Sequence, residues 1–237
     1  MSDRATRFAG LYAVIAAGVA VLLSPLLALS YFATAEGAVQ LEAGTVSAWA
    51  DPAHDLVGRL VTWASPERVY ASYVQVFALL FPAIFFCARA VRARRPAATG
   101  RLERWGWRIA LFGYGLLSVG LIAAAVVLVK SSAAVKGSGA AYDALDAVFI
   151  ALMLPGMLLS VLGSTVLGIA FLRDRYEPRL TPWLLALALP ALLVISTLLG
   201  HNGLALLPLF FAWAATGWQL WRVEPSHAHE PGIAATQ

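Results

Sequence analysis

Residues 198 to 208 read LLGHNGLALLP, and this stretch decides how the last part of the chain is folded. It lies within an apolar region of about forty residues, which as one helix would extend about 60 Å, twice the ~30 Å hydrocarbon thickness of a bilayer. Gly200-His201-Asn202-Gly203 is the turn-like tetrad within that region. Glycine tolerates positive φ, and asparagine adopts the left-handed conformation. We therefore predict a helical hairpin whose polar tip is His201 and Asn202.

The composition of the whole chain agrees with a membrane protein. Of its 237 residues, 60% are hydrophobic and 13% are charged, whereas soluble domains are about 45–50% apolar and about 25% charged. Each apolar run is close to the ~20 residues that a helix needs to cross a bilayer. We predict an all-α, polytopic fold in one domain over residues 1–222, with transmembrane helices at 9–33, 69–90, 109–129, 147–172, 183–199 and 204–221.

The two chain ends are interpreted separately. The first apolar run continues past twenty residues without a clear cleavage motif, so we interpret it as a transmembrane helix and not as a signal peptide. Residues 223–237 are short, polar and interrupted by proline and glycine. Such a segment cannot bury enough apolar surface to fold, and we expect a disordered cytoplasmic tail.

The positive charges predict the orientation of the spans. Alternate connections hold thirteen of the seventeen Lys and Arg residues, and the remaining four are Arg59, Arg68, Lys130 and Lys136. The positive-inside rule then places both termini in the cytoplasm. Fifteen Arg against two Lys, with abundant Ala, is typical of GC-rich bacteria, so we expect a bacterial cytoplasmic membrane. The basic segment 92–108 is expected to contact lipid headgroups and not nucleic acid.

The longest outer connection carries a second structural signal. Asp51-Pro52 is a helix-start pattern, and Leu56, Leu60 and Trp63 follow at i, i+4 and i+7. One apolar face beside polar neighbours is typical of a helix lying along the membrane surface. We predict an extracytoplasmic interfacial helix over residues 52–64.

Four residues form a candidate polar site on the outer face: His54, Asp143, Asp146 and His201. Imidazole and carboxylate groups are reasonable ligands of divalent cations. Asp143 and Asp146 share a helix face near the start of the fourth span, where a carboxylate also stabilises the positive end of the helix dipole. The four residues lack the short fixed spacing of a metal motif, so the metal stays unknown and no cofactor is predicted. A haem between His54 and His201 is a further interpretation.

The fourth span contains small residues at every fourth position: Gly156, Ser160, Ser164 and Gly168. This spacing lets a second helix approach closely. The partner helix belongs to this chain, to a second copy in a homo-oligomer or to another membrane protein.

No sequence feature indicates catalysis. The middle third of every predicted span lacks Asp, Glu, Lys, Arg and His, the residues that typically mark proton relays and ion pathways. Catalytic motifs such as the P-loop are missing, and the single cysteine, Cys87, excludes an intramolecular disulfide and a Cys-based metal site. The leading interpretation is a non-catalytic structural or regulatory subunit, or partner, of a membrane complex. A small-molecule carrier that uses polar residues of the spans is the alternative, and a metal- or haem-binding electron-transfer subunit is the third.

Overall fold

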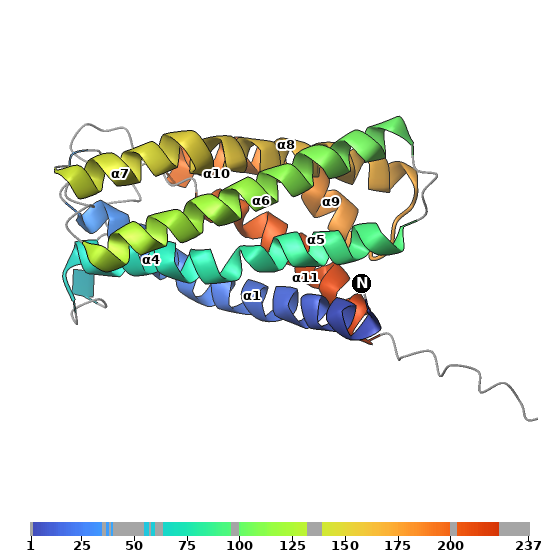
Figure 1. Cartoon of the computed structure of the whole chain (residues 1–237), viewed down its shortest axis with the longest axis horizontal. Coiled ribbons are helices and arrows are strands. Elements are labelled where there is room, and N and C mark those ends of the chain that lie inside the picture. Colours follow the sequence, from blue (N-terminus) through green and yellow to red (C-terminus); the bar gives the residue numbers. More distant parts are fainter. Residues whose placement is uncertain are drawn as a thin grey trace, which may run out of the picture.

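The computed structural model of the chain is a bundle of helices that run along its longest axis (Figure 1). It describes residues 2–34, 37, 39, 55–56, 58–59, 64–95, 100–131, 139–199 and 203–222. Within these ranges the regular structure is helical and there is no strand. The predicted all-α fold is therefore confirmed.

Most of the spans are made of more than one helical segment. The described elements are α1 (Asp3–Leu29) with η1 (Ser30–Ala33), α4 (Pro66–Leu80) with α5 (Pro82–Arg94), α6 (Arg101–Lys130), α7 (Ala140–Val148) with the π-helical turn η3 (Phe149–Met153) and α8 (Leu154–Arg173), α9 (Leu180–Ala186) with α10 (Ala188–Leu199), and η4 (Leu204–Leu206) with α11 (Leu207–Arg222). Five of these segments are long and apolar enough to cross a membrane, and the bent pair α9–α10 makes a sixth if it counts as one span. The chain is a multi-pass helical membrane protein.

Several helices extend beyond the apolar runs from which they were predicted. α6 begins at Arg101 and not at residue 109, α5 ends at Arg94 and not at residue 90, and the fourth span begins at Ala140 and not at residue 147. Long charged side chains are tolerated at the interface because they reach water while the helix continues. The helices are therefore longer than the apolar runs, which we expect to mark the hydrocarbon layer.

The fifth span is broken between α9 and α10, whose axes differ by 57°. Pro190 lacks the amide hydrogen that would bond to the carbonyl of Ala186, the last residue of α9, and its ring crowds that carbonyl. The backbone N of Leu189 donates instead to Oγ1 of Thr165 on α8, at 3.1 Å. A hydroxyl from a neighbouring helix is one of the groups that satisfy a freed backbone amide inside a membrane.

The predicted hairpin tip is described only at its last residue. Gly203 has φ −63° and ψ −37° and leads directly into η4. The expectation that this glycine supplies a positive φ is therefore wrong, because its conformation is right-handed and open to any residue. Gly200, His201 and Asn202 lie outside the described residues, as does the tail 223–237.

The predicted interfacial helix over 52–64 also lies mostly outside the described residues. Asp55, Leu56, Gly58 and Arg59 are described, and all four have helical conformation. The side chain of Leu56 is exposed. The extent and orientation of this helix stay a prediction.

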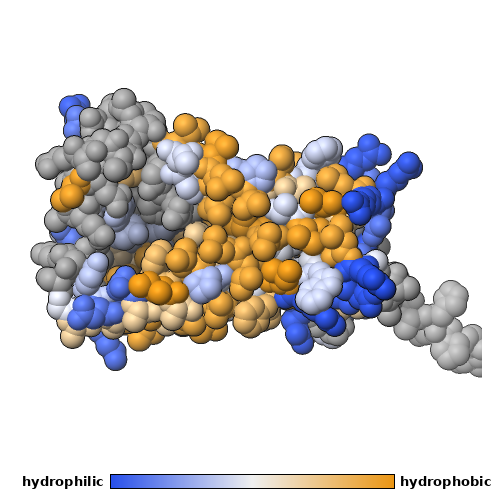
Figure 2. Space-filling model, turned by 90° about the horizontal axis from the view of Figure 1, so that it is seen from above, coloured by the Kyte–Doolittle hydropathy of each residue, from blue (hydrophilic) through white to orange (hydrophobic). Residues whose placement is uncertain are grey.

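One end of the bundle collects most of the described arginines and is called here the arginine-rich end. The start of α1, the end of α5, the start of α6, the α8–α9 connection and the end of α11 meet there (Figure 1). Figure 2 shows hydrophobic residues over the middle of the visible face and hydrophilic residues gathered at that end. Inside the bundle α6 packs mainly against α8, and α1 mainly against α11.

Candidate functional site

The predicted polar site on the outer face lies only partly within the described residues. Asp143 and Asp146 are both exposed on α7, and the backbone N of Asp143 donates to the carbonyl of Gly139 at 3.1 Å in the first helical turn. His54 and His201 lie outside the described residues. Within the part of the chain that is described, no three His, Cys, Asp or Glu side chains form a group that could hold a metal. Convergence of the four residues stays a prediction.

The small residues of the fourth span lie on α8 and are buried: Gly156, Ser160, Ser164 and Gly168. A Cβ added to Gly156 would lie 2.6 Å from the backbone N of Leu117 on α6. A Cβ added to Gly168 would lie 2.2 Å from the backbone N of Ala186 on α9. These distances are shorter than van der Waals contact, so α6 and α9 occupy the groove that the small residues leave.

The close approach of α6 and α8 depends on glycines from both helices. A Cβ on Gly113 of α6 would lie 2.3 Å from the backbone N of Ser160. A Cβ on Gly163 of α8 would lie 2.2 Å from the backbone N of Ala110. Gly163 is outside the four-residue repeat, and the sequence pattern alone did not identify it.

A chain of hydrogen bonds lies at the middle of the bundle, and we call Tyr114, Ser164 and Trp213 the central hydroxyl node. Trp213 Nε1 donates to the Tyr114 hydroxyl at 3.1 Å. The Tyr114 and Ser164 hydroxyls share a short hydrogen bond, and Ser164 Oγ also donates to the carbonyl of Ser160. Tyr114 therefore donates to Ser164, since the Ser164 proton goes to that carbonyl.

The central hydroxyl node connects three spans, and Cys87 adds a fourth. Its three side chains are fully buried, and Tyr114 lies near the midpoint of α6 (Arg101–Lys130). Cys87 Sγ of α5 lies 3.5 Å from the carbonyl of Trp213 on α11. In a membrane, where lipid offers no competing hydrogen bonds, such contacts hold helices together.

A second pair of hydroxyls joins α9 to α11. Thr181 and Thr216 are buried, and their Oγ1 atoms lie 2.8 Å apart. Thr181 Oγ1 donates to the carbonyl of Ala212 at 2.9 Å, so the proton between the two hydroxyls comes from Thr216. The short helix α9 is thus fixed at its first turn.

At the arginine-rich end, Arg95, Glu103 and Asp174 form what we call the charge cluster. Arg95 Nε lies 2.9 Å from Glu103 Oε1 and Arg95 Nη2 lies 2.8 Å from Glu103 Oε2, a bidentate pair. Nη2 also donates to Asp174 Oδ2 at 3.1 Å. Trp107 Nε1 donates to Glu103 Oε1 at 2.9 Å. Glu103 is only 1% exposed, so water screens its carboxylate little. The bidentate pair with Arg95 is therefore the main balance of its negative charge.

Aromatic rings cover the guanidinium of Arg95. Its Cζ lies 5.1 Å from the ring centre of Phe171 and 5.5 Å from that of Tyr176, and these two rings are stacked 4.3 Å apart. The hydrogen bond to Glu103 raises the pKa of Arg95. Burial raises the pKa of the Tyr176 hydroxyl. Arg95 therefore stays charged and Tyr176 stays neutral at physiological pH.

The charge cluster and the central hydroxyl node are joined by tryptophan rings. Trp107, which bonds to Glu103, has its ring centre 6.0 Å from that of Trp213. The ring of Trp213 lies edge-on to Tyr114, with centres 6.2 Å apart. Aromatic pairs at such distances stabilise a core beyond the area that they bury. Buried side chains, joined by hydrogen bonds or by ring contacts, thus extend from the arginine-rich end to the middle of the bundle.

Glu103 is not among the site residues that the sequence predicts. It lies within the basic segment 92–108, which was expected to be a loop in contact with lipid headgroups. The detectable signal was Glu103 with Trp107 at i+4, a carboxylate and an indole on one helix face. The pairing with Arg95 and Asp174 depends on how the α5–α6 and α8–α9 connections meet, which the spacing does not show.

The described side chains of the node and the cluster bond to one another and to backbone carbonyls. Tyr114 and Glu103, the two groups that would otherwise suit proton transfer or ligand binding, each have their hydrogen-bonding atoms occupied within the protein. This arrangement holds helices in register and keeps their polar atoms away from lipid. Comparison of the chain with protein-family models, with curated protein sequences and with solved structures finds no match.

Proposed function

We propose that the chain is a non-catalytic structural or regulatory subunit, or partner, of a membrane complex. The observation that supports this proposal is the central hydroxyl node, in which Tyr114, Ser164 and Trp213 are buried and bonded to one another at mid-span. A carrier typically binds its substrate near the bilayer midplane. Polar side chains that satisfy each other there favour a scaffold over a carrier.

The surface of the fourth span supports a partner role. No residue of α7 or η3 is buried, and Ile150 in the π-helical turn is 60% exposed. π-helical turns within α-helices are frequent at functional sites. We propose this outer half of the fourth span as the contact region for the partner, and a bacterial plasma membrane with the arginine-rich end in the cytoplasm as the setting.

A carrier or permease is the second candidate, and two hydroxyls favour it. Ser24 Oγ on α1 and Ser196 Oγ on α10 are buried without a hydrogen-bond partner among the described residues. A buried hydroxyl without a partner is costly, and a polar substrate or water would satisfy it. The third candidate, a metal- or haem-binding electron-transfer subunit, depends on His54 and His201. Metal and absorbance analysis of the purified protein and of His201→Ala tests it.

The single native cysteine distinguishes a scaffold from a carrier without knowledge of a substrate. Cys87 is fully buried beside Trp213, and a cycle that opens the bundle centre to water would expose it. For a scaffold, N-ethylmaleimide in native membranes should modify Cys87 at least a hundredfold more slowly than an exposed cysteine in Cys87→Ala/Asp143→Cys. Similar rates would contradict the scaffold proposal and favour the carrier.

Photo-crosslinking tests the partner role directly. A photoreactive amino acid at Ile150 should give one discrete adduct with a second polypeptide in native membranes. The matched control is Val129 of α6, which is 74% exposed and should give adducts with lipid alone. If both positions give only lipid adducts, the fourth span does not contact a partner.

A further inference from the structure

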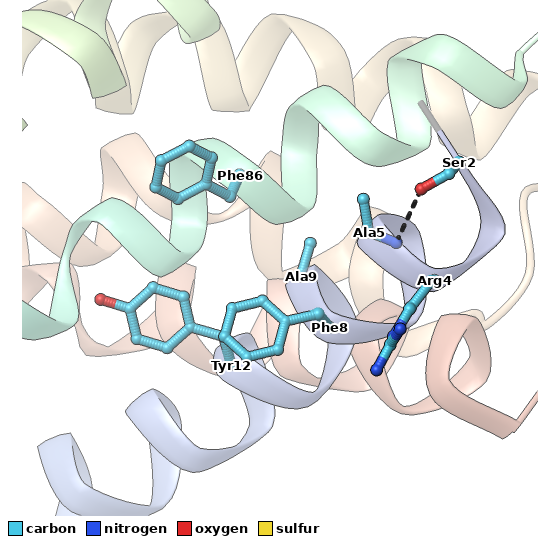
Figure 3. A pocket seen from close by; sticks show the side chains of 7 residues that line it. All are labelled: Ser2, Arg4, Ala5, Phe8, Ala9, Tyr12 and Phe86. Carbon is cyan, nitrogen blue, oxygen red and sulfur yellow. Dashed lines mark hydrogen bonds between the residues drawn. The ribbon is translucent and has the colours of Figure 1, made fainter.

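A groove lies between the start of α1 and the end of α5, at the arginine-rich end. Its volume is about 510 Å³, and it is lined by Ser2, Arg4, Ala5, Phe8, Ala9, Tyr12 and Phe86. Figure 3 shows Phe86 on α5 across the groove from Ala5, Ala9 and Tyr12 of α1. The volume is within the ~300–1,000 Å³ range of small-molecule sites. Neither the central hydroxyl node nor the charge cluster contributes a residue to it.

The groove exists because two alanines leave space between three aromatic side chains. Ala5 and Ala9 are one helical turn apart on α1, and Phe8, Tyr12 and Phe86 form the remaining apolar lining. Phe8 is 69% exposed and Phe86 is 48% exposed. The hydroxyl of Tyr12 donates to the carbonyl of Leu79 on α4. Its polar atom is thus occupied, and the deep part of the groove is apolar.

The other end of the groove carries positive charge. Arg4 is exposed, and no hydrogen bond or ion pair of its guanidinium occurs within the described part of the chain. Asp3, the nearest acidic residue along α1, is paired with Arg94 at 2.8 Å. Arg89, one turn beyond Phe86 on α5, is also exposed. An anion beside Arg4 would therefore meet uncompensated positive charge.

The order of these groups matches the order of groups in a phospholipid. Arg4 and Tyr12 are eight residues apart on α1, which at ~1.5 Å per residue is about 12 Å along the helix axis. Arg4 therefore lies at headgroup level while Tyr12 lies in the hydrocarbon layer. The exposure of Phe8 and Phe86 on transmembrane helices means that the groove opens toward lipid and not toward an aqueous path.

We propose that this groove binds one anionic phospholipid, with its phosphate beside Arg4 and an acyl chain along Phe8, Tyr12 and Phe86. The positive charge selects an anionic headgroup over a zwitterionic one, because each Arg near an anionic headgroup strengthens binding. The apolar lining selects a lipid over a free phosphate. This site is independent of whether the chain is a subunit or a carrier.

Native mass spectrometry of the full-length protein in detergent tests the site, with dioleoyl phosphatidylglycerol as the probe. One equivalent should bind in preference to dioleoyl phosphatidylcholine. Arg4→Gln should weaken the affinity about fivefold, the equivalent of ~1 kcal/mol, and Ala5→Phe should weaken it at least as much by filling the groove. The matched controls Arg104→Gln, an exposed arginine at the same end, and Ala147→Phe, an exposed alanine at the opposite end, should keep the wild-type affinity.

Three results would overturn the proposal. They are unchanged phosphatidylglycerol affinity in both Arg4→Gln and Ala5→Phe, equal affinity for phosphatidylcholine, and equally tight binding of glycerol 1-phosphate, which has the headgroup charge but no acyl chain. Elution volume and melting temperature establish that each variant is folded. If a variant is not folded, Phe86→Ala, which removes an exposed ring from the groove, is tested in its place.

Discussion

The guanidinium of Arg95 and the carboxylate of Glu103 form two parallel hydrogen bonds, 2.9 Å and 2.8 Å long, although eight residues and a chain reversal separate them. The Glu103 side chain is 2% exposed and that of Arg95 is 19% exposed. The pair therefore fixes the end of α5 against the start of α6.

Loss of one member of this pair should destabilise the protein strongly. Glu103→Ala leaves a mostly buried guanidinium without its main counter-charge, and breaking a buried pair in this way costs about 3–5 kcal/mol. The melting temperature in detergent measures the loss. Asp174→Asn is the control, because Asp174 is 49% exposed and an exposed pair contributes less than about 1 kcal/mol. Equal losses in the two variants would contradict a dominant Arg95–Glu103 contact.

Removal of the Tyr114 hydroxyl should loosen the middle of the bundle. In Tyr114→Phe the Trp213 indole N–H loses its acceptor, and we expect a loss of about 1 kcal/mol, within the range for hydrogen bonds between membrane helices. The tryptophan emission spectrum should shift, since the indole of Trp213 changes its surroundings. Tyr142→Phe on α7 is the control. An unchanged spectrum and stability in Tyr114→Phe would show that the node contributes little.

One added methyl group at the α6–α8 contact should destabilise the protein. Gly163→Ala places a Cβ 2.2 Å from the backbone N of Ala110, and overpacking typically costs about 1–3 kcal/mol. Gly115→Ala is a matched control, because its Cβ meets only the ring of Phe85 at 3.7 Å. Both changes add the same helix propensity, so their difference in melting temperature isolates packing. The contact is not tight if the two variants melt alike.

The stability of the protein should depend on the hydrogen bond that Thr165 makes at the break in the fifth span. Thr165→Val removes the hydroxyl that accepts from Leu189 N at 3.1 Å, and the amide next to Pro190 then faces an apolar side chain. We expect a loss of about 1 kcal/mol in unfolding free energy, and Thr165→Ser, which keeps the hydroxyl, should preserve most of the stability. Wild-type stability in Thr165→Val would show that the amide has found another acceptor.

The orientation of the bundle can be tested with reporter fusions. The positive-inside rule predicts that the arginine-rich end lies in the cytoplasm. A reporter that is active only in the cytoplasm should give signal when fused after Gln237 and no signal when fused after Gly137. The reverse pattern would invert the proposed orientation.

The sequence predicted the class of fold because one simple quantity, the length of apolar runs, determines which segments enter lipid. It was less informative about the ends of helices, where Arg94 and Arg101 continue helices beyond the hydrocarbon layer. It also did not predict the break beside Pro190, since another proline, Pro25, lies inside α1 without interrupting it, and the group that accepts from the Leu189 amide, Thr165, lies on a different helix. The charge cluster forms because the α5–α6 and α8–α9 connections lie close together in space. No local sequence pattern predicts that they do.

The fracture of the fifth span also has a consequence for biogenesis. At ~1.5 Å per residue, the seven residues of α9 reach about 10 Å and the twelve of α10 about 18 Å, so neither piece crosses the hydrocarbon by itself. The amide at their junction is satisfied by α8, and Gly168 of α8 accommodates the backbone of α9. Because α8 precedes α9 in the chain, the groups that receive the broken span are synthesised before it. The two pieces of the fifth span can therefore be inserted against a helix that is already present, whereas α11 packs mainly against α1.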